Sequence, residues 1–227
     1  MSSLLPIYET FYAWQGEGAH MGRAAFFIRT FGCPVKCPWC DSAGTWHPEW
    51  IPEKIDRVSV DGLVEQAAAT RAEFVVITGG EPAIHDLGPL VSALKERNLQ
   101  THLETSGGFP IRGNLDWVTL SPKWWRLPLP ENLERANEYK VIVEDENSIQ
   151  RWWQELKPHH RGQPVWLHPE WSQRSNPKVL NSISGAVKDI GAPFRAGYQV
   201  HRLFNVDALD HRSRPTVPLG GNPSKGN

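Results

Sequence analysis

The sequence predicts an α/β domain whose parallel strands form an incomplete, splayed (β/α) barrel of about six strands. Short apolar runs alternate along the chain with segments of helical periodicity. A nearly continuous apolar run is typical of a strand that is buried on both faces of a parallel sheet. Six or seven such runs in 227 residues are too few for a closed eight-stranded barrel. The alternation shows neither an internal repeat nor a second composition, so a single domain is predicted.

The strands are expected at residues 24–31, 74–78, 101–104, 117–120, 139–143, 164–168 and 195–200. Helices are expected between them, with Ser59, Asp86 and Asn176 as capping residues. Three of these helices are expected over residues 59–71, 147–156 and 176–190. Residues 1–12 are predicted to be an irregular lead-in. The domain is predicted to span residues 1–207, and the Pro-, Gly- and Ser-rich residues 208–227 to form a disordered tail.

Composition and charge predict a cytoplasmic protein that binds neither nucleic acid nor membranes. The formal net charge is −1, the pI is about 6.8, and the Lys and Arg residues are dispersed, so no basic groove or patch is expected. No apolar run approaches the ~20 residues of a membrane span. All three cysteines lie in one short motif, so no disulfide framework is evident and a reducing compartment fits.

That motif is C-x-x-x-C-x-x-C, formed by Cys33, Cys37 and Cys40 directly after the first predicted strand. Thiolates spaced this closely can converge on one cluster of soft metal. A 4Fe–4S cube that takes three protein ligands leaves one iron open for another ligand. A zinc site completed by His47 or His85 is the alternative, and three unliganded buried thiols are the remaining interpretation.

Other reactive or unusual residues also follow predicted strands. Because ligands bind at the carboxyl ends of the strands in parallel α/β proteins, these segments are expected to share one rim of the sheet. They are the cysteine loop, G-G-E-P at 79–82, E-T-S-G at 104–107, S-P-K at 121–123, H-P at 168–169 and His201. Arg29 lies within the first strand, where an unpaired guanidinium would be costly to bury. Q-G-E-G at 15–18 is a tight turn that either approaches a ligand or is a bare turn.

With Trp39 just before the third cysteine, and G-G-E-P one βα unit later, the cysteine motif resembles that of the radical S-adenosylmethionine superfamily. The resemblance implies that the open iron chelates the amino and carboxylate groups of the cofactor's methionine part. One electron from the cluster then cleaves the sulfonium and releases a 5′-deoxyadenosyl radical. It also implies that G-G-E-P meets the cofactor's ammonium, since glycines admit a close backbone approach and an acid pairs a cation.

The order of Q-G-E-G, Arg29, C-D-S, V-I-T-G-G-E-P, E-T-S-G and S-P-K is similar to that of the 7-carboxy-7-deazaguanine synthase family, over most of residues 8–207. The resemblance implies conversion of 6-carboxy-5,6,7,8-tetrahydropterin to 7-carboxy-7-deazaguanine, on the route to queuosine and other deazapurines. In the implied mechanism the radical abstracts hydrogen at C6, the ring contracts, the hydrogen returns to the cofactor and ammonia is lost. An electron donor such as flavodoxin and a homodimer are also implied.

The same resemblance implies a role for particular residues. Ser42 is expected to ligate Mg²⁺, which suits an oxygen ligand beside water and substrate, and the cluster ligands are Cys33, Cys37 and Cys40. The residues expected to line the substrate are Trp14, Gln15, Gly16, Glu17, Arg29, Thr78, His201 and Asp207. Those expected to bind S-adenosylmethionine are Trp39, Cys40, Asp41, Gly79, Gly80, Glu81, Thr105, Ser106, Ser121, Pro122, Lys123 and His168. Of these, Arg29 is expected to pair the substrate carboxylate through its planar fork.

The chain departs from the family pattern in two places. His168 stands where some members have glutamine, in a segment that is one residue longer. The chain also continues beyond Asp207, where some members end in a carboxylate that reaches the substrate. The Asp207 side chain is therefore expected either to supply that charge or to be an ordinary solvated acid, and a stop codon after Asp207 is expected to be tolerated.

Two other functions stay open at this point. A radical S-adenosylmethionine activase would make a glycyl radical on a partner protein, and would consume its cofactor. A zinc-stapled binding module would not be an enzyme, and would purify as a colourless protein with a single zinc.

Overall fold

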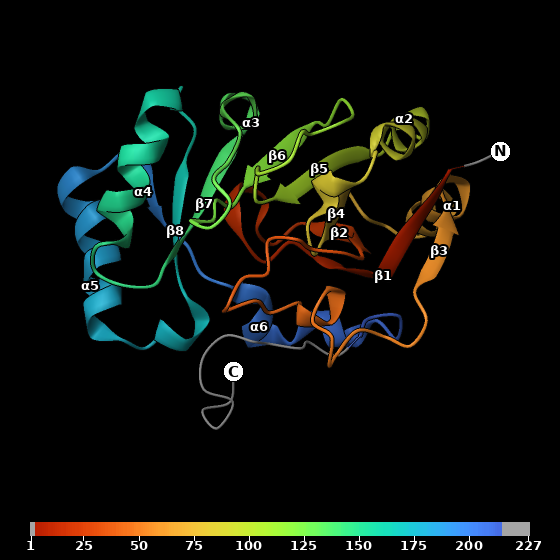
Figure 1. Cartoon of the computed structure of the whole chain (residues 1–227), viewed down its shortest axis with the longest axis horizontal. Coiled ribbons are helices and arrows are strands. Elements are labelled where there is room, and N and C mark those ends of the chain that lie inside the picture. The colour runs from red at the N-terminus through yellow and green to blue at the C-terminus, as the bar shows by residue number, and fades with distance from the viewer. Residues whose placement is uncertain (1–2, 215–227) are drawn as a thin grey trace.

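The chain folds around one curved nine-stranded sheet with the strand order β3-β1-β2-β4-β5-β6-β7-β8-β9 (Figure 1). The computed structural model describes residues 3–214. From β2 to β9 each strand lies parallel to its neighbour, whereas β1 pairs antiparallel with both β2 and β3. The strands are β1 (Leu4–Trp14), β2 (Ala24–Thr30), β3 (Asp56–Ser59), β4 (Phe74–Gly79), β5 (Gln100–Thr105), β6 (Trp117–Leu120), β7 (Glu138–Val143), β8 (Val165–Pro169) and β9 (Phe194–Ala196).

Helices α1 to α5 cover the convex side of this sheet, and the short α6 lies on the concave side (Figure 1). Their bounds are α1 (Val60–Ala68), α2 (Gly88–Glu96), α3 (Pro130–Arg135), α4 (Ser148–Leu156), α5 (Pro177–Gly185) and α6 (Val200–Phe204). The arrangement is a partial, splayed (β/α) barrel, as the sequence predicts. No helix within residues 3–214 is long and apolar enough to cross a membrane.

Two predicted helix starts are confirmed by their hydrogen bonds. The Ser59 hydroxyl accepts from the amide of Gly62 at 3.1 Å. The Asn176 side chain accepts from the amide of Lys178 at 3.1 Å, and Pro177 occupies the first turn of α5. Each side chain satisfies an amide that the helix itself leaves without an acceptor.

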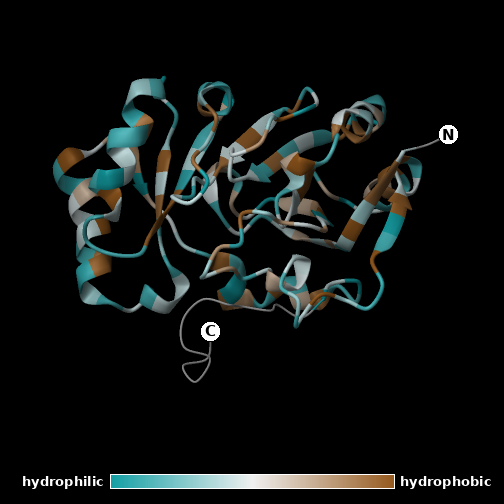
Figure 2. Cartoon of the chain, viewed as in Figure 1, coloured by the Kyte–Doolittle hydropathy of each residue, from teal (hydrophilic) through white to brown (hydrophobic). Residues whose placement is uncertain are grey.

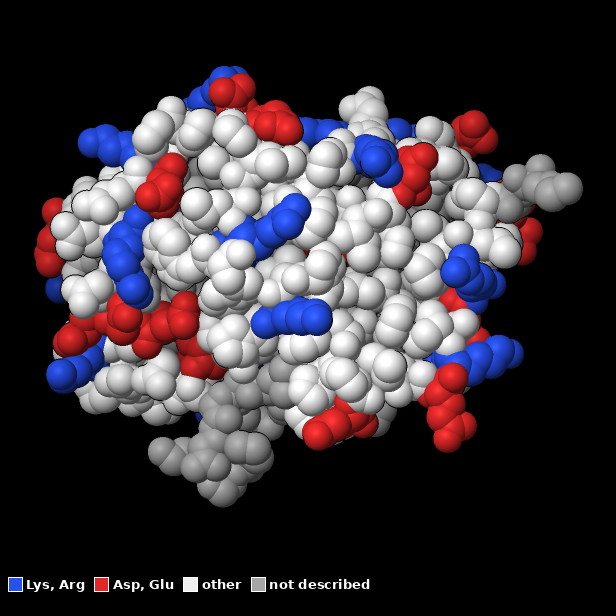
Figure 3. All heavy atoms as spheres, in the orientation of Figure 1, with Lys and Arg blue, Asp and Glu red and all other residues white. Residues whose placement is uncertain are grey.

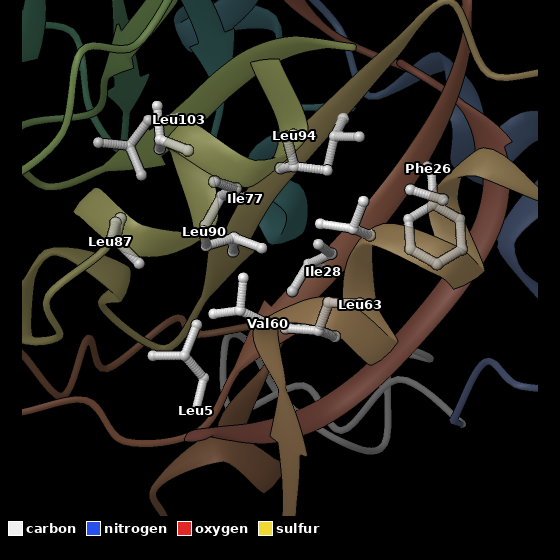
Figure 4. Packing of buried hydrophobic residues seen from close by; sticks show 14 of the residues in the cluster. Leu5, Phe26, Ile28, Val60, Leu63, Ile77, Leu87, Leu90, Leu94 and Leu103 are labelled. Atoms are coloured by element: carbon white, nitrogen blue, oxygen red, sulfur yellow. The ribbon is translucent and has the colours of Figure 1, made fainter. Parts of the chain in front are cut away.

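The larger hydrophobic core lies between the first half of the sheet and the helices α1 and α2. Phe26, Ile28 and Ile77 of β2 and β4 pack in one cluster with Leu63 of α1 and with Leu90 and Leu94 of α2 (Figure 4). Val91 of α2 belongs to the same cluster. A second core joins β6 to β9 with α3, α4 and α5. Apolar residues accordingly alternate with polar ones along the outer helices (Figure 2), because each helix buries only one stripe. The concave side carries two small apolar clusters, one around Phe11 and Val206 and one around Phe74 and Val76, together with the polar residues considered below.

The predicted element pattern was wrong at both ends of the chain. Residues 4–14 are not an irregular lead-in but the strand β1, whose bulge between Ile7 and Glu9 disturbs the alternation that marks a strand. β3 and α3 were not predicted. The last predicted strand stops at Ala196, and His201 lies instead in α6, where Val200, Leu203 and Phe204 have helical spacing. The seven predicted strands are all present, as β2 and β4 to β9, and they are mutually parallel.

Two further boundaries differ slightly. α2 begins at Gly88, and the Asp86 carboxylate accepts from the Gly88 amide at 3.1 Å without being the residue that precedes the helix. α5 ends at Gly185 and continues as one π-helical turn, Ala186–Ile190.

The proposed domain boundary at residue 207 and the disorder of the tail stay predictions. Residues 208–214 are described and contact β1 through Tyr12 and Glu9, whereas residues 215–227 lie outside the described part of the chain. On the face shown in Figure 3, Lys and Arg side chains are interspersed with Asp and Glu, which agrees with the dispersed charges of the sequence.

Candidate active site

A cavity of about 240 Å³ opens at the carboxyl ends of the parallel strands. Every residue that the resemblance places at a ligand lines this cavity, with the exception of Pro122. The lining residues among them are Trp14, Gln15, Gly16, Glu17, Arg29, Cys33, Cys37, Trp39, Cys40, Asp41, Ser42, Thr78, Gly79, Gly80, Glu81, Thr105, Ser106, Ser121, Lys123, His168, His201 and Asp207. The rule that strand ends share one rim therefore predicted which residues line this cavity, and the role of each residue stays a prediction.

The G-G-E-P turn holds the start of the cysteine loop. The Gly80 amide donates to the Thr30 carbonyl at 3.2 Å, and the Glu81 amide donates to the Gly32 carbonyl at 2.9 Å. A Cβ on Gly80 would lie 2.4 Å from the Gly32 oxygen and 2.6 Å from the Cβ of Cys33. Only glycine permits this approach, so the turn after β4 fixes where the loop after β2 begins.

The three thiols suit an iron–sulfur cluster. All three are free, and all three line the cavity. Burial raises the pKa of Cys37 to about 11 and that of Cys40 to about 12, so cluster binding would release protons from them. Among the described residues, no group of three His, Cys, Asp or Glu side chains is placed to hold a single ion. The ligands of a cube need not converge in that way, because each thiolate binds a different iron.

Cys40 receives two N–H donors. The indole Nε1 of Trp46 and the amide of Ser42 both donate to Cys40 Sγ at 3.4 Å. The two histidines of the zinc alternative lie outside the cavity lining. His85 Nε2 contacts the Phe31 carbonyl at 2.9 Å, and the ring of His47 stacks on Trp50 with the centroids 4.7 Å apart.

Glu81 is 1% exposed, and its carboxylate is occupied within the protein. It accepts from the Ala83 amide at 3.0 Å, the Thr105 hydroxyl at 2.6 Å and the Ser106 amide at 2.8 Å. The Ser106 hydroxyl donates to it as well. These bonds account for about all the acceptor positions of a carboxylate. Glu81 therefore ties the end of β4 to the end of β5, which the sequence did not predict.

Lys123 and Trp39 lie side by side in the lining of the cavity. Lys123 Nζ donates to the Ser121 carbonyl at 2.5 Å and to its hydroxyl at 2.8 Å. It also lies 5.2 Å from the ring centroid of Trp39. Burial lowers the pKa of Lys123, while the nearby Cys37 opposes the shift. The S-P-K turn thus presents a desolvated cation beside the cysteine loop.

Arg29 is held from two sides. Its Nε donates to Glu9 Oε1 at 2.6 Å, and its Nη1 donates to the Ser42 hydroxyl at 3.1 Å. Ser42 in turn donates to Asp41 at 3.0 Å, and Arg202 contacts the other Asp41 oxygen at 3.2 Å. Burial acts against ionisation of Asp41, but the Arg202 and Arg29 charges outweigh it and hold the pKa of Asp41 below its ordinary value.

A buried charge triad, consisting of Glu17, Lys140 and Glu104, also lines the cavity. Lys140 Nζ is 2.5 Å from Glu17 Oε2 and 2.8 Å from Glu104 Oε2. Burial would raise the pKa of Glu17, yet Lys140 holds it well below its ordinary value. At Glu104 the effect of burial outweighs the attraction of the Lys140 charge, so the pKa of Glu104 is raised. Gln15 Nε2 donates to Glu104 Oε1 at 3.2 Å, so the triad also orients the Q-G-E-G turn.

His168 is 1% exposed, and neither of its ring nitrogens has a hydrogen-bond partner within the described residues. Burial lowers its pKa to about 4, so the ring is neutral at pH 7. Asp207 also lines the cavity, and burial raises its pKa despite the nearby His201 and Arg29. His201 packs on Gly16, where a Cβ would lie 2.2 Å from its Nδ1.

Sequence reasoning missed Glu9, Glu104, Lys140 and Arg202. Glu104 belongs to the quoted E-T-S-G segment, and its place at a strand end could have identified it. Glu9 lies in the segment that was predicted to be irregular. Lys140 and Arg202 had no local signal, because their partners are far away in sequence.

The fold and this cavity define the class of a radical S-adenosylmethionine enzyme with a partial barrel, and residues 27–123 match the model of the radical SAM superfamily. The chain is 43% identical to the 7-carboxy-7-deazaguanine synthase of Synechocystis over 88% of its own length and 93% of the relative's. It is 37% identical to the synthase of Flavobacterium psychrophilum, over 89% and 93% of the two chains.

The crystal structure of QueE from Escherichia coli superposes with a TM-score of 0.75 at 32% identity, covering 87% of this chain and 95% of that one. The chain therefore belongs to the 7-carboxy-7-deazaguanine synthase family, and its cofactors are a 4Fe–4S cluster and S-adenosylmethionine.

Proposed function

We propose that this enzyme converts 6-carboxy-5,6,7,8-tetrahydropterin to 7-carboxy-7-deazaguanine with loss of ammonia, in the biosynthesis of queuosine and related deazapurines. The supporting observation is that the three cysteines, the G-G-E-P turn and Arg29 line one cavity. When the cluster and S-adenosylmethionine are bound, they supply the radical that begins the ring contraction. The remaining work falls to side chains that hold the two ligands and exclude water.

On the cofactor side, Cys33, Cys37 and Cys40 hold the cluster. The backbone of Gly79 and Gly80 receives the methionine ammonium of S-adenosylmethionine. We assign the Glu81 carboxylate a different task from the one implied by resemblance. Because its acceptor positions are filled by its neighbours, it keeps the rim of β4 and β5 in place for the cofactor.

On the substrate side, Arg29 pairs the carboxylate of the pterin. Glu9 fixes the Nε side of the guanidinium, so the Nη edge is the one that faces the substrate. A guanidinium anchored in this way loses little rotamer freedom when it binds an anion. Gln15 and Glu17 face the same cavity and offer an amide and an ionised carboxylate to the N–H groups of the pterin ring.

The proposal includes Mg²⁺, with the Ser42 hydroxyl as one ligand and with substrate and water as most of the others. An oxygen donor suits this ion. The Ser42 hydroxyl is engaged by Arg29 at 3.1 Å, so the ion requires that contact to open when substrate arrives. The proposal also includes a reducing cytoplasmic setting, an electron donor such as flavodoxin and a homodimer.

Anaerobic turnover with the carboxypterin is the decisive experiment. The expected result is a brown protein with about four irons per chain that forms 7-carboxy-7-deazaguanine, while 5′-deoxyadenosine stays far below product. With substrate deuterated at C6, the label is expected in the recovered S-adenosylmethionine. Stoichiometric release of deoxyadenosine without product would favour the activase instead, and a colourless protein with one zinc would favour the binding module.

A further inference from the structure

The segment after α6 closes one side of the cavity. Residues 206–214, which we call the C-terminal strap, leave α6 on the concave side of the sheet (Figure 1). Val206 is buried against Phe11 and Ala13 of β1, so the strap begins with an apolar anchor. Apart from Ala208 and Leu209, its other residues are polar, and hydrogen bonds to carboxylates hold them to the sheet.

Asp210 attaches the strap to β1. The strand β3 pairs with β1 only at residues 4–7, so further along this edge β1 has no neighbouring strand among the described residues. There the Tyr12 amide donates to Asp210 Oδ2 at 2.8 Å. Arg212 clamps the same carboxylate, with Nη2 2.6 Å from Oδ2 and Nε 3.0 Å from Oδ1. The hydrogen bonds from Arg212 lower the pKa of Asp210, which keeps this carboxylate ionised.

A second contact joins the strap to Arg29. The Arg214 amide donates to Glu9 Oε2, and Glu9 Oε1 accepts from Arg29 Nε at 2.6 Å. One carboxylate therefore bridges the strap and the guanidinium. The side chain of Glu9 is 5% exposed and that of Arg29 18%, so solvent screens this link only slightly.

Between the strap and the sheet lies a second cavity of about 530 Å³. Its lining includes the strap residues Asp207, Asp210 and Arg214, and it shares Arg29, Ser42 and Asp207 with the main cavity. The strap is thus a wall of a continuous chamber, on the side where Arg29 lies. The G-G-E-P turn and the cysteines do not line this second cavity.

We propose that the strap forms the outer wall of the substrate chamber, and that Asp210 and Glu9 are positioning residues that hold Arg29 for the substrate carboxylate. This inference rests on the proposed function. It also replaces the expectation that a stop codon after Asp207 is tolerated, because such a chain would lose Asp210, Arg212 and Arg214 together.

The test is Asp210→Ala in the cluster-loaded enzyme, with Glu134→Ala as the control, since Glu134 is an exposed acid paired with Arg161. Loss of a charge-assisted bond predicts about a tenfold rise in the Kd and KM for the carboxypterin. The Kd for S-adenosylmethionine and the spectrum of the cluster should stay unchanged. Asp210→Asn, which keeps an acceptor for the Tyr12 amide but loses the charge that Arg212 clamps, should recover only part of the affinity. If Asp210→Ala only loosened the fold, the affinities for S-adenosylmethionine and for the carboxypterin would fall alike.

Truncations provide a second measurement should the alanine variant fold poorly. A chain that ends after Asp207 is expected to lose pterin affinity, and one that ends after Arg214, which keeps every contact described here, is expected to match the parent. If Asp210→Ala and the short chain bind the carboxypterin like the parent, or lose both ligands equally, the inference is wrong. A parent that fails to bind the carboxypterin instead overturns the proposed function, and this inference with it.

Discussion

Replacing Lys140 with methionine removes the cation that Glu17 and Glu104 share. The three side chains are 14%, 9% and 15% exposed, so the change leaves two largely desolvated carboxylates facing each other. Breaking a buried ion pair from one side costs about 3–5 kcal/mol of unfolding free energy. We therefore expect Lys140→Met to lose about that much at pH 8.

The loss of unfolding free energy should depend on pH, and the pKa values of the two carboxylates determine whether it grows or shrinks as the pH rises. Without Lys140, burial and mutual repulsion raise the pKa of both acids above their unfolded values. The folded variant then binds more protons than the unfolded chain, so its stability falls as pH rises from the unfolded pKa, about 4.5, towards the raised one. When the pH is lowered from 8 to 5, the unfolding free energy of the variant should therefore rise. The rise should be up to about 1.4 kcal/mol per pH unit for each extra proton that the folded state holds.

The measurement is anaerobic urea unfolding of parent and variant, followed by tryptophan fluorescence at pH 5, 6.5 and 8. Lys95→Met is the matched control, because Lys95 pairs with Asp116 at 2.9 Å on the surface, where such a pair is worth about 0–1 kcal/mol. Adding Glu104→Gln to Lys140→Met should restore part of the loss. This reasoning would be refuted by a Lys140→Met protein whose unfolding free energy at pH 8 lies within about 1 kcal/mol of the parent's. A loss of stability that does not change with pH would also refute it.

Three further outcomes are expected. Trp46→Phe removes an N–H donor to Cys40 Sγ and should lower the reduction potential of the cluster in a redox titration; an unchanged potential would mean that the bond is not made in the loaded enzyme. Ser42→Ala should raise the Mg²⁺ requirement in turnover and leave the cluster spectrum unchanged, whereas a titration like the parent's would remove Ser42 from the metal site. Burial lowers the pKa of His102 to about 3, so the parent should lose up to about 2 kcal/mol between pH 6.5 and pH 5. His102→Phe should flatten that slope in urea unfolding, and an equally steep slope in the variant would assign it to other groups.

The location of the site was predictable because parallel strands end at one rim. Cys33, Gly80, Ser121 and His168 are far apart in the sequence, yet each follows or ends an apolar strand, and this alone brings them to one cavity. The pairing of the half-buried Arg29 with an acid was predictable for a similar reason, since Arg29 interrupts an apolar run and an unpaired guanidinium is costly to bury. Neither inference required any knowledge of which side chains touch.

The pairings inside the cavity could not be predicted in this way. Glu104 and Lys140 project from β5 and β7, which are separated by β6 in the sheet, and their long side chains meet across that strand. Glu17 is 123 residues from Lys140 along the chain. Glu9 was hidden by the bulge in β1, which shifts the register on which strand prediction depends. Long-range ion pairs depend on strand order and register, and sequence periodicity reports neither.

The same pairings explain how a cavity with so many charged side chains is held ready for its ligands. Arg29 is fixed by Glu9, Asp41 by Arg202, and the two acids of the charge triad by Lys140. Glu81, the acid that resemblance assigned to the cofactor, is fixed by four donors from its own neighbours. Because these groups are oriented before the ligands arrive, binding does not have to order them. The free-energy cost of ordering these side chains falls on folding instead. Lys140 belongs to no sequence motif, yet for this reason we expect its replacement to affect stability as strongly as that of a core residue.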